Sequence, residues 1–168
     1  MMARAHPQFA LRPFLVEDTP LLAEIFRASI EELTADDYTE GARQAWASAA
    51  DDEEAFARRL GGQLTLIATM NGSPVGFASL ANNETIDLIY VHPAVAGQGA
   101  GTMLVDALEK LSLARGAKRL TADVSDSAQD FFKKRGFSAQ QRNTVLRGGE
   151  WLANTTMDKT LAAAQGAA

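Results

Sequence analysis

The sequence contains no cysteine. Disulfides, thiolate metal sites and a cysteine nucleophile are therefore excluded, and the composition suits a reducing compartment. No apolar run has the length of a membrane span, and the stretch up to Phe14 lacks the apolar core of a signal peptide. These absences predict a cytoplasmic protein without membrane partners. Two widely separated histidines do not have the spacing of ligands, so no metal site is expected.

Positive charge is also in short supply. Sixteen Lys and Arg face 21 Asp and Glu, which gives a formal net charge of −5. This balance argues against a nucleic-acid partner and mildly favours cationic ligands. The 168 residues show no compositional break, so we expect a single domain over residues 1–168 that buries its own core. A homodimer is left open.

The first third of the chain has mainly helical periodicity. A strand at residues 9–15 precedes a helix that begins at Thr19, whose hydroxyl can cap it, and continues to Leu33. The acidic break at residues 36–39 is followed by two shorter helical pieces, at residues 40–49 and 52–60. This irregular region is where we expect a substrate pocket, and Trp46 either lines it or packs in the core.

The remaining two thirds alternate between strands and helices. Asn71-Gly72 predicts a hairpin turn, and Gly116 predicts the end of a helix. Strand 119–124 is expected to lie parallel to strand 85–91, because a helix connects them. The tail at residues 162–168 is expected to fray. The predicted strands are 63–70, 74–80, 85–91, 119–124, 137–146 and 151–157, with helices at 102–115 and 127–134 and a last turn at 147–149.

The segment 91–102 joins a buried strand to a helix and contains three alternate glycines. The glycines leave the backbone amides uncovered by side chains, and free amides at a helix N-terminus favour a phosphate group, so a pyrophosphate is the expected ligand. A P-loop is excluded because no lysine precedes Thr102. The dinucleotide fingerprint also fails, because its last glycine would fall on Thr102 or Leu104. Asp123, placed like a ribose ligand, leaves a nucleotide-cofactor oxidoreductase as a weak alternative.

Val91, Pro93, Gly97, Gly99 and Gly101 form the pattern V-x-P-x-x-x-G-x-G-x-G. This pattern resembles the cofactor loop, V-x-P-x-x-R/Q-G-x-G-x-G, of the GNAT superfamily of acyl-CoA-dependent N-acetyltransferases. Residues 125–137 resemble its N-x-x-A-x-x-F-Y-x-x-x-G-F stretch, and the order of the elements is that of the family.

The resemblance implies an α/β, GNAT-type fold with a mixed, mostly antiparallel sheet and one parallel strand pair. It implies direct transfer of an acetyl group from acetyl-CoA to a primary amine of a small molecule or a protein. Strand 89–91 would pair with the pantetheine arm. The cofactor-binding residues that it implies are Ile89, Tyr90, Val91, Gly97, Gln98, Gly99, Ala100, Gly101, Thr102, Ser125, Ala128, Phe131 and Phe132.

The chain departs from the family pattern at three positions. Ala96 stands where Arg or Gln is usual, Ser125 replaces Asn, and Phe132 replaces the Tyr that is often assigned to protonate the departing thiolate. Phenylalanine cannot donate a proton. A non-catalytic acyl-CoA-binding sensor is therefore the competing class of function.

Three residues are candidates for the base that removes the ammonium proton: Asp87, Glu84 and Tyr38. Asp87 interrupts an apolar strand, where an unpaired carboxylate is costly to bury. Strand alternation would place it on the same face as Ile89 and Val91. A strand carboxylate that is simply paired or wet is an equal alternative for Asp87, and a solvated turn residue is the plainer interpretation of Glu84.

Overall fold

The computed structural model describes residues 8–161 and contains one seven-stranded sheet of order β1-β2-β3-β4-β5-β7-β6. Neighbouring strands are antiparallel except β4 and β5, which are parallel. This arrangement confirms the predicted fold class. The strands are β1 Phe9–Pro13, β2 Leu64–Met70, β3 Ser73–Ala81, β4 Thr85–Val91, β5 Arg119–Ser125, β6 Ser138–Arg147 and β7 Glu150–Thr160.

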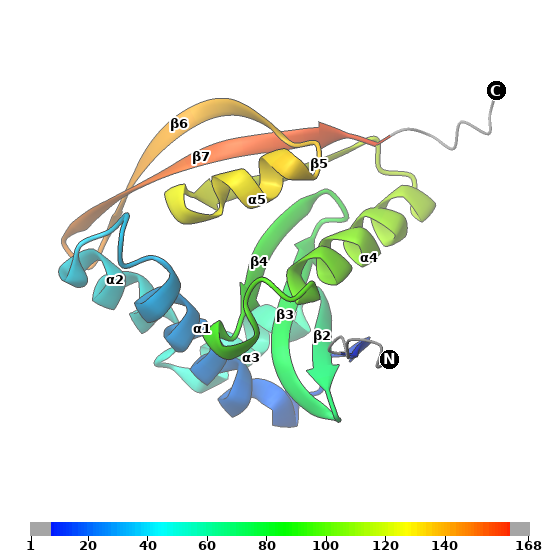
Figure 1. Ribbon diagram of the computed structural model, residues 1–168, viewed down its shortest axis with the longest axis horizontal. Coiled ribbons are helices and arrows are strands. Elements are labelled where there is room, and N and C mark those ends of the chain that lie inside the picture. The colour runs from blue at the N-terminus through cyan, green and yellow to red at the C-terminus, as the bar shows by residue number, and fades with distance from the viewer. Residues whose placement is uncertain (1–7, 162–168) are drawn as a thin grey trace, which may run out of the picture.

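Helices cover both faces of the sheet (Figure 1). Side chains of α1 and α3 pack with Ile67, Phe77 and Leu88 in one apolar cluster. Side chains of α4 and α5 pack against the opposite face, around Leu104 and Phe132. The helices are α1 Thr19–Leu33, α2 Glu40–Ala47, α3 Glu53–Gly61, α4 Ala100–Ala114 and α5 Gln129–Lys134, with short 3-10 turns at Val16–Asp18, Ser48–Ala50, Pro93–Val95 and Asp126–Ala128.

The parallel strands β4 and β5 stay together for only two residue pairs, Thr85 with Thr121 and Ile86 with Ala122. Beyond these pairs β5 continues along β7 as far as Ser125, while β4 continues along β3 as far as Val91. The sheet therefore opens between the carboxyl ends of β4 and β5, and this opening positions the candidate site.

Several boundaries differ from the sequence prediction. Helix α4 begins at Ala100 instead of residue 102, because Gly99 takes the N-cap position with a φ of 105° and Gly101 already lies in the first turn. The last hairpin is longer than expected, since its turn needs only Gly148 and Gly149, both with positive φ. The tail at residues 162–168 lies outside the described residues. Among residues 8–161, no helix has the length and apolar character needed to cross a membrane.

A β-bulge at Asp87 corrects the expected alternation along β4. Leu88 is opposite Ser79 and Ile86 is opposite Leu80, so Asp87 is an extra residue without a partner on β3. Ile86, Ile89 and Val91 all pack on the α4 side of the sheet, whereas Leu88 packs on the α1 and α3 side. Asp87 therefore does not share a face with Ile89 and Val91, and its carboxylate turns toward Arg59 on α3.

Candidate active site

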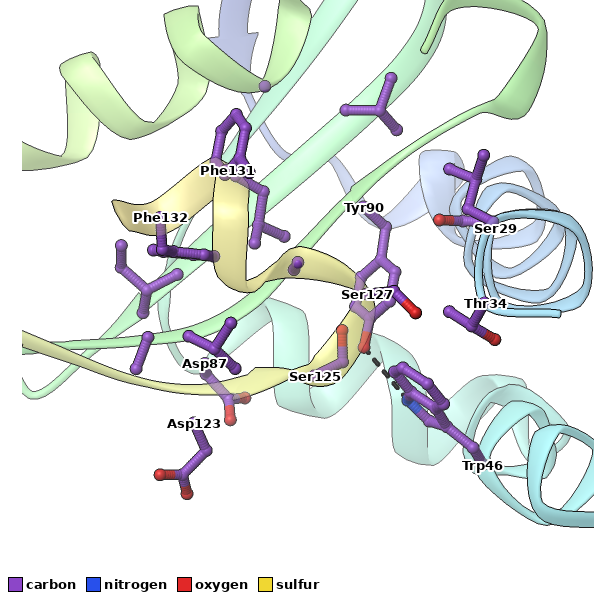
Figure 2. Close-up of a pocket in the computed structure, with 18 residues that line it drawn as sticks. Ser29, Thr34, Trp46, Asp87, Tyr90, Asp123, Ser125, Ser127, Phe131 and Phe132 are labelled. Carbon is purple, nitrogen blue, oxygen red and sulfur yellow. Dashed lines mark hydrogen bonds between the residues drawn. The ribbon is translucent and has the colours of Figure 1, made fainter. Parts of the chain in front are cut away.

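A cavity of about 250 Å³ occupies the opening between β4 and β5 (Figure 2). The end of β4 forms one wall, and β5 and α5 form another. Ser29 of α1 and Thr34, the residue after α1, also line the cavity. Most of the lining is apolar, and its polar groups are a few hydroxyls and carboxylates. A lining of this kind is typical of a ligand site rather than of a gap in packing.

The edge of β4 that faces this opening carries free backbone groups. His92 donates its amide N–H to the Val75 carbonyl at 2.8 Å, so this residue is bonded toward β3. Bonding alternates along an antiparallel ladder, which directs the amides of Ile89 and Val91 away from β3 and toward the cavity. An amide-rich ligand can pair with these groups as an added strand would.

The glycine loop reaches the cavity at its helical end. Gly97 and Gly99 have φ angles of 78° and 105°, and a Cβ on either would meet no atom within 4 Å. These two positions are open, and the free amides of the α4 N-terminus lie beside them. Gly101 lines the cavity, and a Cβ there would come within 3.2 Å of the Phe131 ring.

Not every predicted loop residue faces this cavity. Gly97, Gln98 and Gly99 are exposed outside its lining, and Ala100 is buried. The Thr102 hydroxyl accepts a hydrogen bond from Arg135. The Arg135 guanidinium also lies 3.9 Å from the centre of the Phe131 ring, so Thr102 helps to join α4 to α5.

Helix α5 supplies the aromatic wall. Phe131 and Phe132 both line the cavity, together with Ser125 and Ala128 just before the helix. Phe132 is only 2% exposed and lies edge-on to Phe131 and Phe137, with ring centres 5.3 and 5.0 Å apart. The side chain that replaces the family's tyrosine is therefore an apolar core residue with one side on the cavity.

A second cavity, of about 180 Å³, adjoins the first on the side of α2, α3 and the β6–β7 hairpin. Its lining is more polar and includes Tyr38, Arg59, Arg147 and Asn154. The residues that line both cavities are Trp46, Asp87, Tyr90, Asp123 and Ser125. These residues mark a junction where two ligands, one from each cavity, can meet.

Asp87 is held at this junction by two donors. Its carboxylate accepts Nε and Nη2 of Arg59 at 2.8 and 3.0 Å, and Nε2 of Gln63 at 2.9 Å. Burial alone would raise the pKa of Asp87, but the hydrogen bonds from Arg59 and Gln63 outweigh it and hold the pKa below its usual value. The group is therefore a fixed anion at neutral pH.

Residues 34–161 match the family model described as "Acetyltransferase (GNAT) domain". The chain belongs to the GNAT acetyltransferase family.

Individual relatives are similar over most of the chain. The peptidyl-lysine N-acetyltransferase YjaB of Salmonella typhimurium is 32% identical over 124 residues, which cover 74% of this chain and 69% of that protein. The crystal structure of a GCN5-related N-acetyltransferase from Rhodopseudomonas palustris has a TM-score of 0.90 and 62% identity, and the match covers 96% of this chain and 99% of that chain. The PaiA N-acetyltransferase of Thermoplasma acidophilum, solved with coenzyme A, shares the fold with a TM-score of 0.76 at 20% identity, covering 91% and 99% of the two chains.

In this GNAT chain a tyrosine on β4 stands at the junction. Tyr90 packs edge-on against Phe26 and accepts a hydrogen bond from Trp46 Nε1 at 3.2 Å (Figure 2). Burial, partly offset by this hydrogen bond, raises the pKa of Tyr90 to about 12. Its hydroxyl proton has no acceptor among residues 8–161, so it is free to be donated to a ligand at the junction.

The other two candidate bases have different surroundings. Tyr38 lines the second cavity, but its hydroxyl donates to the Ala153 carbonyl at 2.5 Å and accepts from the Asp126 amide at 2.9 Å. Burial raises the pKa of Tyr38, so it keeps its proton and joins the α1–α2 segment to β7. Glu84 is exposed before β4 and lines neither cavity; it borders a separate hollow with Gly116 and Lys118. The geometry leaves Glu84 without access to the junction.

The sequence analysis did not select Asp123 or Arg59, which both line the second cavity, as site residues. Asp123 follows the last β4–β5 pair on β5, just as Asp87 follows it on β4, so the predicted parallel pairing would have placed the two carboxylates beside each other. The Thr156 hydroxyl donates to Asp123 Oδ1 at 2.6 Å. For Arg59 no local signal exists, because it lies 28 residues from its partner Asp87.

Proposed function

We propose that the protein transfers the acetyl group of acetyl-CoA directly to a primary amine. The observation that carries the proposal is the junction, where residues of β4 and β5 line both the cavity beside the glycine loop and the cavity beside α2 and α3. Direct transfer requires the amine nitrogen and the thioester carbon to meet in one orientation. Two adjoining cavities with shared walls support the proposal, because each can hold one of the two reactants.

The first cavity is proposed to hold the acetyl-CoA arm. The amides of Ile89 and Val91 would pair with the pantetheine, and Tyr90 lies between them on β4. The loop from Gly97 through Gln98, Gly99, Ala100 and Gly101 to Thr102 would hold the pyrophosphate at the N-terminus of α4. Ser125, Ala128, Phe131 and Phe132 would enclose the thiol end. The complex of PaiA with coenzyme A supports this donor, since the two chains share one fold.

The reaction balances without an enzyme-bound intermediate. The acceptor ammonium loses one proton, its nitrogen attacks the thioester carbon, and a C–N bond forms. The C–S bond then breaks as the sulfur leaves as a thiolate, and the nitrogen loses its second proton to solvent, so the products are the amide, the coenzyme A thiolate and two protons. A β4 amide would donate to the carbonyl oxygen as that oxygen gains charge. We assign the first proton step to Asp87 acting through a water molecule, because it is the candidate base that reaches both cavities. Its lowered pKa means that the proton passes on to solvent.

Tyr90 is proposed to assist the leaving sulfur. A thiol has a reference pKa near 8.5, so complete transfer from a tyrosine whose pKa is about 12 would be uphill by about 5 kcal/mol. Tyr90 would therefore donate a hydrogen bond to the thiolate and keep its proton. This role uses a hydroxyl group, which the side chain of Phe132 lacks.

The test is a screen of primary amines with acetyl-CoA that measures the release of free coenzyme A thiol. Turnover with at least one amine, with the N-acetyl product identified by mass spectrometry, is the expected result. Because Phe132 replaces the family's acid, an acyl-CoA sensor is the second candidate. Clear binding of acetyl-CoA in calorimetry with no turnover of any amine would replace the enzyme by the sensor.

A further inference from the structure

The charged side chains that line the second cavity are not all paired with one another. Four charged side chains line it: Arg59, Asp87, Asp123 and Arg147. Arg59 and Asp87 form a two-pronged ion pair and neutralise each other. The charges that remain are the carboxylate of Asp123 at the junction and the guanidinium of Arg147 at the end of β6.

The guanidinium of Arg147 makes no hydrogen bond or ion pair with any side chain of residues 8–161. Its cross-strand neighbour is Glu150, the natural partner in an antiparallel pair. The Glu150 carboxylate instead lies against Gly41, within about 3.2 Å of where a Cβ on that glycine would sit. Gly41 is in the first turn of α2, where a carboxylate is favourable, so the Glu150 carboxylate lies at α2 and not at Arg147.

The turn that carries Arg147 is fixed on the body of the protein. Gly148 and Gly149 close the hairpin with φ angles of 53° and 80°. A Cβ on Gly148 would come within 3.3 Å of the Ala45 Cβ, so the turn packs against α2. The backbone at Arg147 is therefore fixed beside the second cavity, its exposed side chain lines that cavity, and its charge acts on both Asp87 and Tyr90.

Asp123 provides the opposite charge. Its Oδ1 accepts the Thr156 hydroxyl, and no Lys or Arg among the described residues pairs with it. The side chain lines both cavities, which places an ammonium bound to it where the acyl group is received.

We infer that the acceptor is a primary amine that also carries a carboxylate, with the amine held at Asp123 and the carboxylate held by Arg147. This inference specifies the acceptor of the acetyl transfer, so it rests on the proposed function. Guanidinium binds carboxylate through paired hydrogen bonds, which suits Arg147 to this task.

The strand positions also indicate the length of the acceptor. Asp123 is opposite Thr156 on β7, and Arg147 is opposite Glu150, six positions away. Six residues of strand span roughly 20 Å, and the two side chains shorten this distance. The amine and the carboxylate are therefore several bonds apart, as in an ω-amino acid and not as in an α-amino acid.

The experiment compares ω-amino acids of increasing chain length with alkylamines of the same length, measuring kcat/KM with acetyl-CoA. The wild-type protein should prefer one of the longer ω-amino acids to its matched alkylamine by about tenfold or more. In Arg147→Gln this ratio should fall to near one, and Arg147→Lys should restore part of it. Arg58→Gln removes the same charge from an exposed position outside the cavity and should keep the wild-type ratio.

Two failures can be told apart. If alkylamines are acetylated as well as every ω-amino acid, or if Arg147→Gln keeps the wild-type ratio, the inference is wrong while the proposed function stands. If acetyl-CoA supports turnover of no amine of either series or of the wider screen, the proposed function itself fails. Acetylation of a lysine in a peptide, with no activity on either series, would overturn the inference in favour of a protein acceptor.

Discussion

Replacing Asp87 by Asn tests two contributions of this carboxylate, one to the stability of the fold and one to the proposed proton transfer. Asn keeps the size of the side chain but removes the charge and turns one acceptor oxygen into a donor. At least one of the bonds from Arg59 or Gln63 is then lost. A hydrogen bond to a charged group contributes about 1.5–3 kcal/mol. Because the Arg59 side chain is 39% exposed, solvent screening reduces this, and we expect a loss of about 1 kcal/mol.

The stability effect should depend on pH. The pKa of Asp87 is lower in the folded protein than in the unfolded chain, so its contribution is present above the unfolded pKa of about 3.9 and is lost as the pH falls through the folded value. Thermal unfolding at neutral pH should therefore show a Tm about 2–4 °C lower for Asp87→Asn. The difference should shrink below about pH 4.

The kinetic effect tests the proton step. If Asp87 removes the ammonium proton through water, Asp87→Asn should lower kcat/KM by a factor on the order of a hundred. The deficit should shrink at high pH, where more of the amine is already deprotonated. Acetyl-CoA affinity should stay close to the wild-type value.

Asp18→Asn is a matched control. Asp18 accepts both Nη1 and Nη2 of Arg12 at 2.8 Å, its pKa is likewise lowered, and it lines neither cavity. It should lose stability with the same pH dependence and keep its activity. Unchanged kcat/KM in folded Asp87→Asn would remove Asp87 from the proton step, and an equal deficit at every pH would leave it only an electrostatic role.

Three further predictions concern the cofactor side and the hydroxyl groups. Gly99→Glu should abolish the calorimetric heat of acetyl-CoA binding, because it places a carboxylate at the proposed phosphate position. The control Gly116→Glu, at another open glycine with a φ of 92°, should strain the backbone and keep binding. A wild-type protein that binds NAD and not acetyl-CoA would refute the cofactor assignment. Phe132→Tyr should not raise turnover, and a clear gain would show that an acid is missing; a loss of acetyl-CoA affinity above tenfold, about 1.4 kcal/mol, would indicate tight packing. Tyr90→Phe should lower kcat by about tenfold with little change in KM for acetyl-CoA, whereas Tyr38→Phe, which removes two structural hydrogen bonds, should lower the Tm; the reverse pattern would exchange their roles.

The parts of the fold that depend on neighbouring residues were predictable from the sequence. Asn71-Gly72 closes the β2–β3 hairpin as expected, because Asn71 and Gly72 both adopt the positive φ angles that the turn needs. The helix between β4 and β5 determined that these strands are parallel. The glycine loop could also be identified from the sequence, because its conformation depends on its own residues. The start of α4 was two residues off because a glycine can be both a loop residue and an N-cap.

The chemistry of the junction was less predictable, because it depends on residues that are distant in the chain. Tyr38 could be placed near the acceptor pocket, but its partners Ala153 and Asp126 lie 115 and 88 residues away. The residues near Tyr38 in the sequence do not show that its hydroxyl both donates and accepts a hydrogen bond. The same holds for Arg59, which turns Asp87 from an unpaired carboxylate into one half of an ion pair.

The bulge at Asp87 explains how one strand serves both sides of the junction. Tyr90 and Leu88 pack on the α1 and α3 side, so uninterrupted alternation would direct the Asp87 carboxylate into the apolar cluster under α4. Burying an unpaired carboxylate there would cost several kcal/mol, whereas the extra residue lets Ile86 fill that face and lets Asp87 reach Arg59. A charged residue at a position that alternation would bury is thus a sign of a bulge. Here the bulge leaves apolar side chains and free amides on the side of β4 that is proposed to hold the cofactor, and it directs the one carboxylate of the strand toward Arg59 at the edge of the second cavity.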